Sequence, residues 1–96
     1  MFGKNMNFED LPNTMVLTTK EVITNKREIL FVSHDADDGM WQFHCGTDVD
    51  MDDAVLVALE EIIDVDPAIT AVADLPLGWV AWRENTVSPW KREEAN

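Results

Sequence analysis

The side chains best suited to chemistry in this chain lie within one short stretch, residues 33–46. It contains both histidines, His34 and His44, and the only cysteine, Cys45. Side chains of these types can supply a general base, a nucleophile or metal ligands. Three carboxylates occupy the same stretch: Asp35, Asp37 and Asp38. These six residues are therefore the first candidates for a catalytic, metal or binding site.

The run Ser33, His34 and Asp35 has the residue types of a hydrolase triad. In an extended strand, consecutive side chains point to opposite faces, so His34 cannot link Ser33 to Asp35. The sequence also contains no Gly-x-Ser-x-Gly elbow, which would present a serine nucleophile. We expect no serine nucleophile here.

A cysteine and a histidine can form a nucleophile pair or half of a metal site, and a hairpin can bring His34 towards Cys45. Cys45, however, shares one face of its strand with Trp41 and Phe43. A lone cysteine on an apolar face is typical of a small buried hydrophobe. The chain has no second cysteine and no spaced histidine pair to complete a zinc site. We expect core packing, no metal and no cofactor. A small enzyme or metal-dependent protein that uses His34, His44, Cys45 and the neighbouring aspartates is the alternative.

A second acidic stretch begins like a calcium-binding loop, with Asp48, Asp50 and Asp52 at alternate positions. Its sixth position is Asp53, where an EF-hand needs glycine, and its twelfth is Leu59, where an EF-hand needs glutamate. The stretch is not an EF-hand. The sequence leaves open whether the acidic loops bind divalent metal.

The charge of the chain is large and uneven. The net charge is −12 over 96 residues, and residues 35–74 include twelve acidic side chains and no Lys or Arg. Nucleic-acid binding depends on cations that displace counterions, so it is not expected. A basic protein partner fits the charge, which acts over about 8–10 Å at physiological salt. The alternative is an acidic surface that only keeps the protein in solution.

The cysteine count and the hydropathy pattern favour the cytoplasm. A single cysteine cannot form an internal disulfide, and a free thiol fits a reducing compartment. The apolar runs are too short to span a membrane. The first ten residues lack the basic and apolar segments of a secretory signal. We expect no contact with a membrane.

The elements that position the candidate residues follow from periodicity and turn signals. Residues 28–33 are apolar on both faces, which predicts a central strand, and residues 40–45 alternate as an antiparallel neighbour. Asp37, Asp38 and Gly39 supply the turn between them. Further segments are an edge strand at 15–17, a short helix at 20–23, an extended segment at 54–57, helices at 59–65 and 67–74, and a closing strand at 79–83. A single helix from residue 53 is the alternative to the extended segment at 54–57 and the helix at 59–65.

These elements predict an α+β fold: an antiparallel sheet of about three to five strands with two or three short helices. We expect a mobile arm over residues 1–13, one domain over 14–90 and a polar tail over 91–96. Tryptophan is favoured at interfaces, so Trp82 and Trp90 are candidates for a surface patch beside Arg83 and Lys91, and packing against the core or the tail is the alternative.

Several separated motifs resemble a family of small bacterial proteins of unknown function. They are Ile29-Leu30-Phe31-Val32-Ser33-His34-Asp35, Asp38-Gly39-x-Trp41-Gln42-Phe43, Gly46, Leu59-x-Glu61-Ile62, Asp66-Pro67-x-Ile69 and Leu75-Pro76-x-Gly78-Trp79-x-Ala81-x-Arg83. The resemblance covers about residues 15–84. Met40 departs from it, because a small residue often precedes the tryptophan. Part of that family is described as immunity-protein-like, which implies inhibition of a toxin in bacterial competition and supplies no catalytic residues.

The sequence therefore favours a non-enzymatic cytoplasmic protein that binds a macromolecule, in the manner of a toxin-neutralising immunity protein. The candidate binding residues are His34, Asp35, Asp37, Asp38, His44, Trp82 and Trp90. Besides the enzyme alternative, a structural homodimer that pairs through sheet edges or tryptophans is open.

Overall fold

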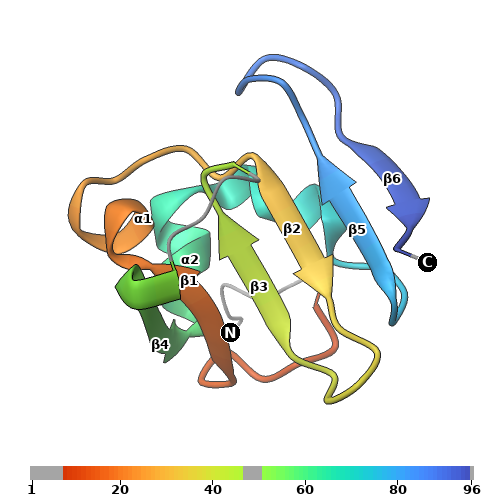
Figure 1. The fold of residues 1–96 in the computed structure, drawn as a ribbon, viewed down its shortest axis with the longest axis horizontal. Coiled ribbons are helices and arrows are strands. Elements are labelled where there is room, and N and C mark those ends of the chain that lie inside the picture. Colours follow the sequence, from red (N-terminus) through yellow and green to blue (C-terminus); the bar gives the residue numbers. More distant parts are fainter. Residues whose placement is uncertain (1–7, 47–50, 96) are drawn as a thin grey trace.

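A computed structural model describes residues 8–46 and 51–95 of the chain. These residues form an α+β fold with a six-stranded sheet in the order β4-β1-β3-β2-β5-β6 (Figure 1). The strands are β1 (Met15–Thr19), β2 (Phe31–His34), β3 (Trp41–His44), β4 (Ala54–Ala58), β5 (Trp79–Trp82) and β6 (Lys91–Glu94). The helices are α1 (Lys20–Thr24), η1 (Met51–Asp53), α2 (Leu59–Val65) and η2 (Pro67–Val72).

The predicted hairpin is formed by β2 and β3, with His34 opposite Trp41 and Phe31 opposite His44. Gly39 has a φ of 74°, a left-handed conformation that glycine adopts without steric cost. The carboxylate of Asp38 accepts a hydrogen bond from the backbone N–H of Met40 at 2.9 Å. The turn therefore uses the chemistry expected of it.

The ambiguous segment after residue 53 divides into a strand and a helix, β4 and α2, rather than forming a single helix. In α2, Leu59, Ile62 and Ile63 are buried at helical spacing. Asp66 then caps η2, because its side chain accepts a hydrogen bond from Ala68 N at 3.1 Å. The helix predicted at 67–74 is thus a shorter 3₁₀ helix.

The sheet differs from the expected antiparallel sheet of three to five strands in its strand count and at one pair. β1 lies between β4 and β3 and runs parallel to β3, with Leu17 opposite Gln42. It is therefore an interior strand and not the expected edge strand. The cause is burial, since Val16 and Thr18 are fully buried and the Thr18 hydroxyl donates to Phe43 O at 2.7 Å.

The described residues near both ends of the chain are more ordered than the sequence indicates. Residues 91–94, expected within a polar tail, form edge strand β6, where four exposed charged residues suit a strand facing water. Residues 8–13 were expected within a mobile arm. Phe8 is nevertheless buried, and its ring packs edge-to-face on Trp41 with 5.1 Å between centroids. Residues 1–7 lie outside the described residues.

One face of the sheet carries the core. Val16, Val32, Phe43 and Ala81 are fully buried on the side of α2 and η2, and α2 lies behind the strands in Figure 1. The opposite face, here called the open face, bears the side chains that alternate with these: Met15, Leu17, Phe31, Ser33, Gln42, His44, Leu56, Val80 and Trp82. No helix in the described part of the chain is long and apolar enough to cross a membrane.

Candidate functional site

His34 lies at the turn end of β2, on the core side of the sheet. Its ring stacks on the Trp41 indole, with 3.9 Å between centroids and 13° between planes. Its Nδ1 lies 2.8 Å from the carbonyl oxygen of Leu75. A carbonyl oxygen can only accept, so Nδ1 carries the hydrogen and donates it. In the neutral ring, Nε2 is then the acceptor nitrogen.

Two open depressions meet at His34. One has a volume of about 270 Å³ and is lined by the hairpin turn, Gly78 and Trp79. The other has a volume of about 240 Å³ and is lined by Trp41 and by the segment after η2. Both are smaller than the roughly 300–1,000 Å³ of typical small-molecule sites. Their size suits an inserted side chain better than a whole substrate.

Asp35 begins a line of hydrogen bonds across the open face. Its carboxylate accepts from Ser33 Oγ at 3.1 Å and from Gln42 Nε2 at 2.6 Å. Because the Gln42 amide nitrogen faces this carboxylate, its oxygen faces His44, whose Nε2 lies 2.9 Å away. His44 Nε2 must therefore carry the hydrogen, and Nδ1 must be the acceptor nitrogen.

His44 is buried, although the alternation of its strand indicates a partly wet face. Only 4% of the residue is exposed, and its Nδ1 has no hydrogen-bond partner among the described residues. Burial lowers the pKa of His44 below its ordinary value of 6.5, and the nearby Asp35 charge offsets this only in part. The ring is therefore neutral at physiological pH, with its free nitrogen shielded from solvent.

Cys45 is half-buried against the core, and its Sγ donates to Glu21 Oε1 at 3.4 Å. Burial, together with the hydrogen bond and the charge of Glu21, raises the pKa of the thiol above its ordinary value of 9.0. An activated nucleophile needs the opposite shift. The hairpin does not bring His34 to Cys45: His34 faces Trp41, four residues before Cys45, which is about 13 Å along a strand.

Asp37 and Asp38 line the depression beside His34 but form no hydrogen bond or ion pair with a histidine among the described residues. Ser33 and Asp35 share the open face while His34 points to the other, as the alternation predicts. Asp37 and Asp38 are exposed at the hairpin tip. Among the described residues, no group of three His, Cys, Asp or Glu side chains is placed to hold a metal ion. Residues 48 and 50 of the calcium-like loop lie outside that part of the chain.

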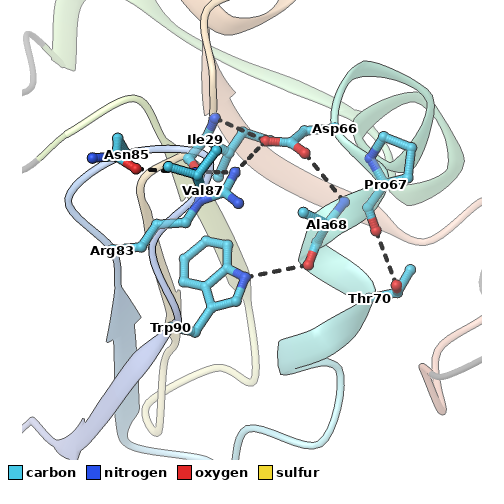
Figure 2. A network of polar contacts seen from close by, with 9 residues as sticks. All are labelled: Ile29, Asp66, Pro67, Ala68, Thr70, Arg83, Asn85, Val87 and Trp90. Atoms are coloured by element: carbon cyan, nitrogen blue, oxygen red, sulfur yellow. Dashed lines mark hydrogen bonds and ion pairs between the residues drawn. The ribbon is translucent and has the colours of Figure 1, made fainter.

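The two candidate tryptophans have different surroundings. Trp82 is half-buried on the open face, opposite Phe31. The Trp90 indole N–H donates to Ala68 O at 3.3 Å, and the Arg83 guanidinium lies 4.4 Å from its ring centroid (Figure 2). Trp90 therefore attaches the segment before β6 to η2.

Arg83 is the centre of a buried polar cluster that sequence reasoning missed (Figure 2). Its side chain is 3% exposed, and its Nε and Nη2 both donate to Ile29 O, at 3.0 and 2.9 Å. Nη2 also donates to Asp66 Oδ2 at 2.6 Å, and this oxygen accepts from Ile29 N at 3.2 Å. Asp66 can be recognised in the sequence as a helix cap before Pro67, whereas Arg83 is marked only as a basic residue at the end of an apolar strand. The cluster is structural, and it leaves Arg83 unable to bind an external anion.

No family model, no curated protein and no solved structure matches this chain. The resemblance to immunity-protein-like sequences therefore stays a prediction.

Proposed function

We propose that this protein is a non-enzymatic binding protein with a cationic protein partner, and that it neutralises this partner as an immunity protein neutralises a toxin. The observation that carries the proposal is the charge of residues 35–74, with twelve acidic side chains and no Lys or Arg. In the fold, this segment supplies the hairpin tip and both ends of β4. Such a surface attracts a cationic partner and speeds its association.

The placement of the arginines supports a cationic rather than an anionic partner. Arg83 is buried with Asp66. Arg92 lies 2.8 Å from Asp74. The Arg27 guanidinium lies 3.6 Å from the carboxylate of Glu21. Each of these arginines already faces a carboxylate of the same chain, which does not favour nucleic acid as a partner.

The chemistry of the reactive residues favours binding over catalysis. The Cys45 thiol is held protonated by the raised pKa. The free nitrogen of His44 is buried, and His34 is fastened by its stack and its hydrogen bond. A single thiol also favours a reducing compartment, so we place the protein in the cytoplasm.

The test is capture of the partner by the full chain in an extract of its native cells, followed by measurement of the salt dependence with the purified partner. We expect a partner with net positive charge and an affinity that falls steeply between about 50 and 200 mM salt, where screening shortens to about 8–10 Å. A neutral or acidic partner, or an affinity that salt does not change, would contradict the proposal.

A matched pair of charge variants distinguishes local attraction from overall charge. Asp37→Asn with Asp38→Asn removes two charges at the hairpin tip, and the amide oxygen at position 38 can still accept from Met40 N. Glu93→Gln with Glu94→Gln removes two charges on β6, outside the acidic segment. Only the first pair should weaken binding. An equal loss in both would show that the hairpin tip has no special role.

A further inference from the structure

The two edge strands of the sheet differ in their protection against pairing with another chain. β6 consists of Lys91, Arg92, Glu93 and Glu94, and all four are exposed. Charged side chains on an edge strand hinder the addition of a further strand. β4 reads Ala-Val-Leu-Val-Ala, with no charge and no proline. The described structure thus has one protected edge and one unprotected edge.

The hydrogen bonds on the inner side of β4 fix the direction of its backbone groups. Leu59 N donates to Thr14 O at 2.8 Å, at the position that continues the β1–β4 register. In an antiparallel ladder, hydrogen-bonded and non-bonded pairs alternate along the strands. Val57 and Val55 therefore make the hydrogen bonds to β1.

The remaining residues of β4 direct their N–H and C=O groups away from β1. These are Ala54, Leu56 and Ala58. The Ala58 N–H is already taken, because it donates to Glu61 Oε2 at 3.3 Å. The 3₁₀ turn of η1 uses the Ala54 N–H, so Leu56 presents a backbone donor and an acceptor along the edge and Ala54 presents an acceptor, where a further strand would bind.

The side chains at this edge complete an apolar surface on the open face. Leu56 is 54% exposed, and the neighbouring Met15 of β1 is 50% exposed. Leu17 is opposite Leu56 in the register and is half-buried. Ala54 and Ala58 are small, so they leave room on both sides of Leu56. Alternate side chains of an added strand can pack against Leu56 and Met15.

Charges at the two ends of β4 select the occupant. Asp52 and Asp53 precede the strand, and Glu60 and Glu61 follow it. A second copy paired antiparallel about Leu56 would bring the acids before one strand towards those after the other, and each copy carries a net charge of −12. A segment with Lys or Arg at both ends meets opposite charge at each end.

We propose that β4 is the docking edge for an extended segment of the cationic partner, which adds to the sheet as a seventh strand. The segment has apolar side chains at alternate central positions and basic residues at both ends. This inference rests on the proposed function, and it adds the place and the conformation of the bound segment.

The experiment uses the full chain labelled with ¹⁵N and the peptide Lys-Lys-Val-Thr-Val-Thr-Val-Lys-Lys. One control peptide has proline in place of its central valine, and another has Glu in place of every Lys. We expect the Lys-ended peptide to slow exchange of the Leu56 amide by about tenfold or more, as pairing into a sheet does. The proline and Glu-ended peptides should leave this exchange unchanged.

Two variants with the same substitution locate the site on the protein. Leu56 and Leu77 are exposed to nearly the same extent, 54% and 57%, so Lys at either position should leave the fold intact. Leu56→Lys places a cation on the edge and should weaken the affinity for the Lys-ended peptide by about tenfold or more. Leu77→Lys, beside the depression at His34, should change its affinity little.

The outcomes separate this inference from the function on which it rests. If the Lys-ended peptide changes the amide chemical shifts of residues 35–38 alone, the docking edge at β4 is refuted, whereas the proposal of a cationic partner still holds. Equal binding of the Glu-ended peptide at β4 would refute the charge selection, and with it the proposed function. Failure of all the peptides to bind, or a dimer in light scattering that Leu56→Lys abolishes, would also overturn the inference.

Discussion

Replacing Arg83 by alanine should remove much of the stability of the fold. The change deletes a hydrogen bond to a carboxylate, worth about 1.5–3 kcal/mol, and the two N–H groups that Ile29 O accepts, worth about 1 kcal/mol. It also removes the cation above Trp90, worth about 0.5–1 kcal/mol. Together these agree with the roughly 3–5 kcal/mol expected when one partner of a buried ion pair is removed. The loss is a large part of the roughly 5–15 kcal/mol that stabilises a typical domain.

The assay is urea unfolding followed by tryptophan fluorescence, with the free energy of unfolding extrapolated to water. The control is Arg92→Ala, because Arg92 and Asp74 form an ion pair exposed at 34% and 77%, which should contribute little. Arg83→Lys keeps the charge but loses the planar fork, so its stability should lie between those of the wild type and Arg83→Ala. A loss for Arg83→Ala no larger than that for Arg92→Ala would refute the reasoning.

Three further predictions follow from the site. Because the pKa of His44 is lowered in the fold, the unfolded chain binds a proton at this histidine first as the pH falls. The free energy of unfolding should therefore decline below about pH 6.5 and level off below the folded pKa. His44→Gln should flatten this decline when urea unfolding is measured at several pH values. The raised pKa of Cys45 predicts slower alkylation by iodoacetamide than glutathione shows at the same pH, and Glu21→Gln should accelerate it, as mass spectrometry can record. Gly39→Ala should cost about 1–2 kcal/mol of unfolding free energy because of its left-handed φ, whereas Gly46→Ala, which meets no atom within 4 Å, should be nearly neutral.

The parts of the fold that could be predicted from the sequence are those with local signals. Trp41 and Phe43 alternate with polar neighbours, and Gly39 marks the turn, so the β2–β3 hairpin follows from residues close together in the chain. Asp66 before Pro67 likewise places the start of η2. Such patterns depend on backbone conformations that a few consecutive residues determine.

Features that depend on distant residues could not be predicted in this way. The pairing of Leu17 with Gln42 places β1 inside the sheet, but periodicity indicates only that a strand is buried and does not name its neighbours. The burial of Arg83 depends on Ile29 and Asp66, which no local pattern connects to it. For the candidate site, alternation separated His34 from Ser33 and Asp35, but it did not show that His44 would be buried.

The strand order has a consequence for synthesis of the chain. β2 pairs with β3, which follows at once, and with β5, whose residues are made about 50 positions later. A nascent chain that ends before Trp79 therefore holds Phe31 and Val32 in a strand with one side unpaired. Because pairings between distant residues form slowly, the sheet closes only after β5 has left the ribosome. Until then, the strand that becomes the centre of the molecule is its exposed edge.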